Sequence, residues 1–215
     1  MVNDLSIEQL NITRESYNKL AKEYALKVER NPKVIKDVEK FLLKPFDNVL
    51  SRAGYKSIAF IGCGTGRDMQ WFMDREYDCF GYDISEGMIE EAKKWVNNSN
   101  FYVLDIVKDA LPKDKFDAIY CDSVLNYICR ADLNDAIENI KQSLHPGGYA
   151  LLCFKVDGEN IYEDNLLSLK RYYLSFNKGF IMNLMDVYFE IIKMSMQIDP
   201  FGRKTSWMHL FVRNH

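Results

Sequence analysis

Apolar residues recur at two different periods along the 215 residues of this chain, and the period changes near residue 57. Before the change, apolar positions follow helical spacing and Asn31-Pro32 interrupts the run. This predicts one helix up to the break and a second from Pro32 to about Leu50. After the change, short apolar runs alternate with helical stretches. The alternation predicts β-α-β units, and therefore a doubly wound α/β fold whose mostly parallel sheet has helices on both faces.

The short apolar runs predict five strands, and the segments between them predict helices. The strands are expected at Ser57–Ile61, Asp78–Tyr82, Asn100–Leu104, Phe116–Cys121 and Tyr149–Val156. Helices are expected from Asp68 to about Glu76, from Ser85 onward and from Asp132 through Leu144, and His145-Pro146-Gly147-Gly148 is expected to form a turn.

The chain after residue 156 follows a different pattern. Here we predict a helix over about Tyr162–Phe176 and a shorter one over Lys178–Asp186. Two extended runs then follow, at Tyr188–Asp199 and Trp207–Arg213, with Pro200-Phe201-Gly202 turning the chain between them. Two such runs predict a hairpin that closes the edge of the sheet.

A strand that leads straight into three glycines is the clearest chemical signal. Gly62-Cys63-Gly64-Thr65-Gly66 follows the first predicted strand and precedes a helix. Glycine suits a backbone that turns tightly and lets a ligand approach, and the first turn of a helix offers unpaired N–H groups. The loop is not a P-loop, since no Gly-Lys-Ser/Thr follows, and Arg67 stands where the dinucleotide pattern requires glycine.

Acidic residues end the next two predicted strands. Asp83 lies where a carboxylate can accept hydrogen bonds from ribose hydroxyls, although it could instead cap the following helix, a task that Ser85 already fits. Asp105 could accept a hydrogen bond from an adenine amino group, and Ile84 and Ile106 could sandwich the ring. Together with the glycine loop, these residues predict a nucleoside site.

With these pieces in order, the chain resembles the class I S-adenosylmethionine-dependent methyltransferases, in particular members that act on small molecules. The resemblance covers about residues 55–155 and implies S-adenosylmethionine as cofactor, with a Rossmann-like sheet of order 3-2-1-4-5-7-6 whose strand 7 is antiparallel. Most members carry an acid two residues before the first glycine, where this chain has Phe60. The matching pieces are Gly62-Cys63-Gly64-Thr65-Gly66, Asp83, Asp105, Phe116-Asp117-Ala118-Ile119-Tyr120 and His145-Pro146-Gly147-Gly148.

The resemblance also implies where cofactor and acceptor would bind within one domain. The expected division is a helical cap (1–55), a cofactor-binding core (56–156), a helical roof over the acceptor site (157–186) and a closing hairpin (187–215). The expected acceptor contacts are Tyr24, Ser123, Asn126 and Tyr127. The expected cofactor contacts are Tyr17, Gly62, Cys63, Gly64, Gly66, Asp83, Ile84, Asp105, Ile106 and Asp122, with Asp122 or Tyr17 as substitutes for the missing acid.

The composition and charge of the chain argue against several kinds of partner, namely nucleic acid, a metal ion and a membrane. The formal net charge is -3, so no global basic excess points to nucleic acid. Five cysteines without a C-x-x-C pair and only three histidines indicate reduced thiols and no metal site. The start of the chain does not read as a signal peptide and no run is long enough to span a membrane, so we expect a cytoplasmic protein without membrane contact.

We therefore expect a methyltransferase with a small-molecule acceptor, acting as a monomer or homodimer, with no catalytic base assigned. Three alternatives stay open: a non-catalytic protein that binds or senses S-adenosylmethionine, a nicotinamide-dependent oxidoreductase and, more narrowly, a methyltransferase that acts on a protein. Lys155, Arg171 and Arg203 could bind an acceptor anion, but solvated surface is expected for each. His209 is expected in an edge strand and is not assigned as a base.

Overall fold

One sheet of seven strands organises the structure, a computed structural model that describes residues 4–97, 100–157, 160–198 and 205–215. The strand order is β3-β2-β1-β4-β5-β9-β8, and β9 runs antiparallel to both of its neighbours. Because β6 and β7 pair in a separate sheet, the order counted within the main sheet is 3-2-1-4-5-7-6, as predicted. The strands of the main sheet are β1 (Ser57–Ile61), β2 (Asp78–Asp83), β3 (Phe101–Val103), β4 (Phe116–Cys121), β5 (Leu144–Val156), β8 (Glu190–Ile198) and β9 (Ser206–Arg213).

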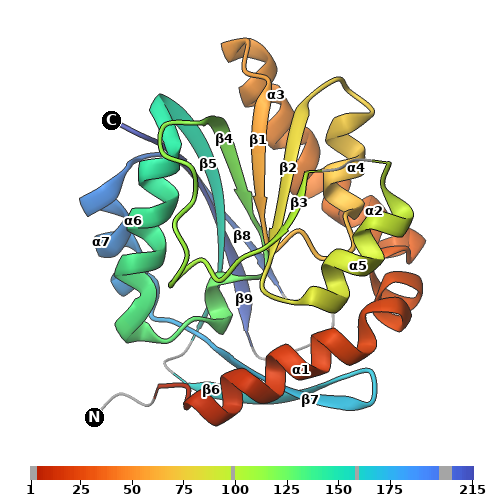
Figure 1. Ribbon diagram of the computed structural model, residues 1–215. Helices are drawn as coiled ribbons and strands as arrows, with labels where there is room; N and C mark the ends of the chain where they lie inside the picture. The colour runs from red at the N-terminus through yellow and green to blue at the C-terminus, as the bar shows by residue number, and fades with distance from the viewer. Residues whose placement is uncertain (1–3, 98–99, 158–159, 199–204) are drawn as a thin grey trace.

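Helices cover both faces of this sheet (Figure 1). One face packs against α6 and α7 through a cluster that includes Phe116, Ile137 and Met185. The other packs against α3, α4 and α5 through a cluster that includes Phe46 and Phe72. Burial of these two clusters orders the strands whose carboxyl ends carry the site. The helices on the two faces are α3 (Lys44–Ala53), α4 (Arg67–Met73), α5 (Glu86–Trp95), α6 (Leu133–Ser143) and α7 (Lys178–Tyr188).

The N-terminal segment is helical and breaks where the sequence predicts. The helix α1 (Ile7–Tyr24) begins at a capping box in which Ser6 and Gln9 bond each other's backbone N–H groups. The helix α2 (Pro32–Val38) begins after Asn31, whose side chain accepts a hydrogen bond from the backbone N of Lys33. Short π-helical turns, η1 (Ala25–Glu29) and η2 (Glu39–Leu43), follow α1 and α2.

The helix α1 lies along the open edge of the core between α5 and a β-hairpin (Figure 1). On one side, Asn18 Oδ1 accepts hydrogen bonds from Ser85 Oγ at 2.7 Å and from the backbone N of Gly87 at 3.2 Å. On the other, Ser16 Oγ donates to the carbonyl of Lys170 at 2.6 Å, and Thr13 Oγ1 accepts from the backbone N of Tyr172 at 2.9 Å. These bonds hold α1 as a cover over the carboxyl ends of the strands.

The prediction of a helix over 162–176 is wrong. The segment forms a hairpin of β6 (Ile161–Leu166) and β7 (Leu169–Leu174), so residues 157–186, predicted as wholly helical, contain this hairpin followed by α7. The turn contains Leu167 at φ 57°, a left-handed position where glycine or asparagine would be expected. Hydrogen bonds from the backbone of this segment to the side chains of Thr13 and Ser16 of α1 hold it extended.

Two further expectations about the sheet need correction. Residues 145–148 belong to β5 and form an irregular stretch opposite Asp117, rather than a turn before the strand. His209 is not at an edge, because β9 lies between β5 and β8. The predicted turn at Pro200-Phe201-Gly202 lies outside the described residues, whereas β8 and β9 confirm the antiparallel pair on either side of it.

Candidate active site

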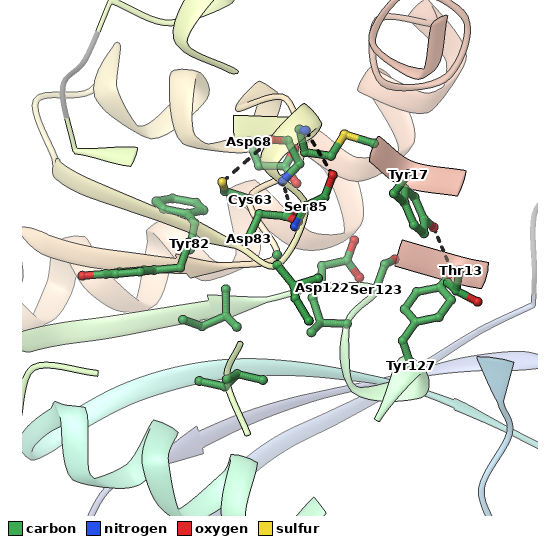
Figure 2. A pocket seen from close by; sticks show the side chains of 18 of the residues that line it. Thr13, Tyr17, Cys63, Asp68, Tyr82, Asp83, Ser85, Asp122, Ser123 and Tyr127 are labelled. Atoms are coloured by element: carbon green, nitrogen blue, oxygen red, sulfur yellow. Dashed lines mark hydrogen bonds between the residues drawn. The ribbon is translucent and has the colours of Figure 1, made fainter. Parts of the chain in front are cut away.

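A cavity of about 700 Å³ opens at the carboxyl ends of β1, β2 and β4, beneath α1 (Figure 2). Its size falls in the range of about 300–1,000 Å³ that is usual for small-molecule sites. Within the described ranges, no group of three or more His, Cys, Asp or Glu side chains is arranged to hold a metal ion. The predicted residues that line the cavity are Tyr17, Tyr24, Gly62, Cys63, Gly64, Asp83, Ile84, Asp105, Ile106, Asp122, Ser123 and Tyr127.

The glycine loop and Asp83 form one hydrogen-bonded unit. Gly62 has φ 69° and Gly64 has φ 55°, which are backbone conformations that favour glycine. Asp83 Oδ2 accepts a hydrogen bond from the backbone N of Gly64 at 3.0 Å, and Oδ1 accepts from the backbone N of Ser85 at 2.9 Å. Burial raises the pKa of Asp83 to about 6, although both bonds favour the ionised form. The carboxylate therefore braces the loop while lining the cavity.

Glu29 brings a second carboxylate to this loop. It is not among the site residues predicted from the sequence. Its side chain accepts hydrogen bonds from both the backbone N and the hydroxyl of Thr65, and Arg30 Nη1 donates to the same hydroxyl at 2.8 Å. Burial raises the pKa of Glu29 above its usual value. No motif marks this residue, because the π-helical turn η1 brings it to the loop from a segment 36 residues away in sequence.

The proposed ring subsite lies at the end of β3. Ile84 and Ile106 both line the cavity, with Ile106 buried and Ile84 exposed for 43% of its surface. Asp105 Oδ1 accepts from the backbone N of Val107 at 3.1 Å, and Oδ2 accepts from Lys108 Nζ at 2.9 Å. Each oxygen of Asp105 therefore already has one partner, and its remaining lone pairs are available to a ligand.

The wall beyond β4 combines charged groups with aromatic rings. Asp122 lines the cavity, and burial together with the neighbouring Asp68 raises its pKa to about 6. Asp68 itself pairs with Arg67, whose Nε lies 2.5 Å from Oδ1. Both residues of this pair line the cavity, and their position directly after the glycine loop could have indicated this from the sequence.

Phe60, which replaces the usual acid, is part of an apolar wall. Its ring lies 5.4 Å from that of Tyr120, measured between centroids, and both line the cavity. Trp207 and His209 of β9 extend the same wall, and burial lowers the pKa of His209 to about 4, so this imidazole is neutral at neutral pH. Trp207 is not among the site residues predicted from the sequence, and His209 is predicted only in an edge strand, because only the antiparallel pairing with β5 brings β9 to the cavity.

Above the cavity, two tyrosine hydroxyls meet a buried arginine. Tyr17 Oη and Tyr127 Oη lie 2.9 Å apart (Figure 2), and Arg171 Nη1 donates to them at 2.9 Å and 3.2 Å respectively. Arg171 Nη2 pairs with Asp164 Oδ2 at 3.0 Å. Because Arg171 of β7 is only 8% exposed, the expectation of a solvated side chain is wrong for it.

The remaining expected residues lie elsewhere. Lys155 is also buried, where its Nζ donates to Thr205 Oγ1 at 3.2 Å and lies over the ring of Trp207. Arg203 lies outside the described residues. Gly66 is not part of the cavity wall and forms the N-cap of α4. Asn126 is fully buried outside the wall, and within the described part of the chain its amide has no hydrogen-bond partner.

Comparisons with known sequences found a matching family model and a curated relative. Residues 60–152 match the model of a family described as methyltransferase domain. A polyketide synthase-nonribosomal peptide synthetase of Aspergillus clavatus is 30% identical over 134 residues. That match covers 57% of this chain and only 3% of the relative's length.

Solved structures share the fold at low sequence identity. Magnesium protoporphyrin IX methyltransferase from Synechocystis is 16% identical, with a TM-score of 0.73 and coverage of 99% of this chain and 100% of its own. The 1,6-didemethyltoxoflavin-N1-methyltransferase of Burkholderia thailandensis is 13% identical, with a TM-score of 0.71 and coverage of 100% and 93%. An S-adenosylmethionine-dependent methyltransferase of Clostridium acetobutylicum is 16% identical, with a TM-score of 0.69 and coverage of 92% and 98%.

Proposed function

We propose that this chain, which carries a methyltransferase domain with the class I fold, binds S-adenosylmethionine and transfers its methyl group to a small molecule. The observation that carries the proposal is Asp83, which accepts hydrogen bonds from the glycine loop and from Ser85 while it lines the cavity. This arrangement places a carboxylate beside a loop whose backbone is open to a ligand. It fits a ribose, whose two hydroxyls are hydrogen-bond donors.

The residues present suit the cofactor along the whole cavity. At Gly64, a Cβ would meet a carboxylate oxygen of Glu29, so glycine is what lets this carboxylate approach the loop. Ile84 and Ile106 supply apolar surface for a purine ring, and Asp105 supplies an acceptor for an amino group. Glu29 and Asp122 supply the acidic groups that Phe60 does not, at the end of the cavity where we place the ammonium group of the methionine moiety.

The chain's own contribution to the reaction is positioning. When bound, S-adenosylmethionine supplies a methyl group that its sulfonium makes electrophilic. The loop and Asp83 orient the donor, and α1 with its hairpin covers the cavity and limits water. Holding two reactants close and in line lowers the barrier by up to several kcal/mol, roughly. We assign no general base, because the acceptor atom decides whether one is needed.

A small methyl acceptor suits the cavity that lies under α1 and the hairpin of β6 and β7. The cavity is lined on one side by Phe60, Tyr120 and Trp207, which favour a partly apolar molecule. Two similar structures are, by their names, methyltransferases of magnesium protoporphyrin IX and of 1,6-didemethyltoxoflavin, both small molecules. The formal net charge of -3 argues against a nucleic acid as the methyl acceptor.

We place the protein in the cytoplasm, as a monomer or homodimer. All five cysteines carry thiols, and Cys79, Cys121 and Cys153 are buried, which suits a reducing compartment. Among the helices that the structure describes, none is long and apolar enough to cross a membrane.

Calorimetric titration tests the proposal directly. We expect the purified chain to bind S-adenosylmethionine and S-adenosylhomocysteine with micromolar affinity and not to bind NAD. Tighter binding of NAD would replace the proposal with a nicotinamide-dependent reaction. Binding of S-adenosylmethionine that never yields S-adenosylhomocysteine, across a panel of small acceptors, would favour a non-catalytic binding protein.

The affinity for S-adenosylhomocysteine should depend on pH through Asp83. Its pKa of about 6 lies above the usual value, so the carboxylate becomes protonated, and a weaker acceptor, as the pH falls. We expect affinity to fall by up to about tenfold between about pH 7 and pH 5. In Asp83→Asn the affinity should depend less on pH. In Asp122→Asn the pH dependence that comes from Asp83 should persist. A full pH dependence in Asp83→Asn would contradict this assignment.

A further inference from the structure

The protons of the two tyrosine hydroxyls at the cavity, Tyr17 and Tyr127, can be assigned to hydrogen bonds one by one. Each tyrosine hydroxyl carries one proton, and a guanidinium nitrogen such as Arg171 Nη1 carries two. Arg171 Nη1 is within hydrogen-bond distance of both Tyr17 Oη and Tyr127 Oη, which are themselves in contact. Arg171 can therefore donate one proton to each hydroxyl, and one hydroxyl donates to the other. One hydroxyl proton is left with no acceptor among the described residues.

The surroundings of Tyr17 keep its hydroxyl neutral, and the hydrogen bonds of the pair leave it as a donor. Burial raises the pKa of Tyr17 well above its usual value, more than the adjacent Arg171 lowers it, so the hydroxyl keeps its proton at neutral pH. Three of the lone pairs of the two oxygens are already used by Arg171 and by the mutual bond. A charged donor also polarises each hydroxyl, which strengthens it as a donor and weakens it as an acceptor.

Arg171 is held so that it serves the tyrosines rather than a ligand. It is 8% exposed and does not line the cavity, whereas Tyr17 and Tyr127 do. Its Nη2 is occupied by Asp164 of the paired strand, and its Nε has no partner within the described residues. The hairpin of β6 and β7 thus carries a buried cation to the back of the pair, and the bonds of α1 to that hairpin fix the distance.

We propose that Tyr17 and Tyr127, backed by Arg171, form a hydrogen-bond donor that selects acceptors with an electron-rich oxygen facing the pair, as in a phenolate, an enolate or a carboxylate. This inference rests on the proposed function, because it assigns the pair to the acceptor. A protonated amine at the same place would meet a donor and a cation, so it is rejected. Arg171 is a positioning residue, since it acts through the two hydroxyls.

Matched fluorinated probes test the selection without knowledge of the natural acceptor. 4-Fluorophenol and 4-fluoroaniline have nearly the same size and differ in the group presented. We would titrate each into the protein with and without S-adenosylhomocysteine and follow the fluorine chemical shift by NMR, which reports both affinity and ionisation of the phenol. We expect the phenol to bind about tenfold more tightly than the aniline, with its ionisation midpoint lowered by about one pH unit on binding.

Three variants separate the donor pair from general packing. Tyr17→Phe combined with Tyr127→Phe removes both hydroxyls and should abolish the shift in the midpoint, whereas Tyr127→Phe alone leaves Tyr17 bonded to Arg171 with its proton free to donate. Arg171→Lys keeps a charge but has a single nitrogen where Arg171 uses two, Nη1 for the hydroxyls and Nη2 for Asp164, so it should lose most of the shift. Tyr162→Phe is the matched control, because Tyr162 lies on the same hairpin, stacks on Tyr173 and does not line the cavity. Unfolding curves would confirm that each variant is folded.

The outcomes distinguish this inference from the proposed function. Equal affinity for the two probes, no binding of the phenol, or an unchanged midpoint in the variant that lacks both hydroxyls would overturn the donor pair, even where S-adenosylhomocysteine binds. Selection of the phenol by a protein that does not bind S-adenosylhomocysteine would support the donor pair and overturn the methyltransferase function instead.

Discussion

Replacing Asp83 with alanine is expected to weaken the binding of S-adenosylhomocysteine about a hundredfold. The carboxylate would lose the ribose hydroxyls, and a hydrogen bond to a charged group contributes about 1.5–3 kcal/mol, where 1.4 kcal/mol is a factor of ten. The same substitution removes the acceptor for the backbone N of Gly64, so the loop also loses the contact that holds its position. Isothermal calorimetry on the variant and the unchanged protein would measure both effects together.

The matched control for this substitution is Asp78→Ala. Asp78 is exposed and begins the strand β2 that Asp83 ends, so it lies at the opposite edge of the sheet from the cavity. Its loss should leave the affinity within about twofold. If Asp83→Ala bound S-adenosylhomocysteine as tightly as Asp78→Ala does, then Asp83 would only brace the helix α5 and the ribose assignment would be wrong.

Replacing Gly62 with alanine is expected to lower the free energy of unfolding by about 2–4 kcal/mol. Gly62 has φ 69°, where a side chain costs about 1–2 kcal/mol, and an added Cβ would overlap the Cγ2 of Val124. Overpacking of this kind typically costs a further 1–3 kcal/mol, roughly. Urea unfolding followed by circular dichroism would measure the loss.

A second substitution separates the two causes. In Gly62→Ala combined with Val124→Ala, the nearest atom to the added Cβ would be the Cβ of residue 124 at 3.5 Å, which is an ordinary contact. The double variant should therefore recover the overlap part of the loss but not the part due to φ, and a double-mutant cycle would give the coupling. Additive effects of the two substitutions would show that Val124 does not set the requirement for glycine.

Local patterns were sufficient for the core of the sheet and for one half of the candidate site. The strands around Ile58 and Ile119 are buried on both faces. Their apolar runs are therefore continuous, and their positions can be predicted from the sequence. Glycines with positive φ and an acid at the end of the next strand are also local features. The glycines matter because of their backbone conformation, and the acid because it stands at the end of a strand. Both features depend on only a few neighbouring residues.

The other half of the site depends on contacts between distant segments. Glu29 reaches the glycine loop through a π-helical turn, His209 reaches the cavity through an antiparallel strand, and Arg171 reaches two tyrosines through a hairpin. Leu167 in the turn of that hairpin adopts a left-handed conformation that its own side chain disfavours.

The amino-acid sequence by itself therefore determined the α/β class, the strand order that its family resemblance implies, the glycine loop and the position of Asp83. Only the tertiary structure decided that residues 161–174 form a hairpin and that Arg171 is buried behind Tyr17 and Tyr127. The physical reason is that the cover is made by side-chain bonds from α1 to the backbone of β7. Such bonds stabilise an extended conformation in a segment whose own pattern predicts a helix, so no local pattern can reveal it.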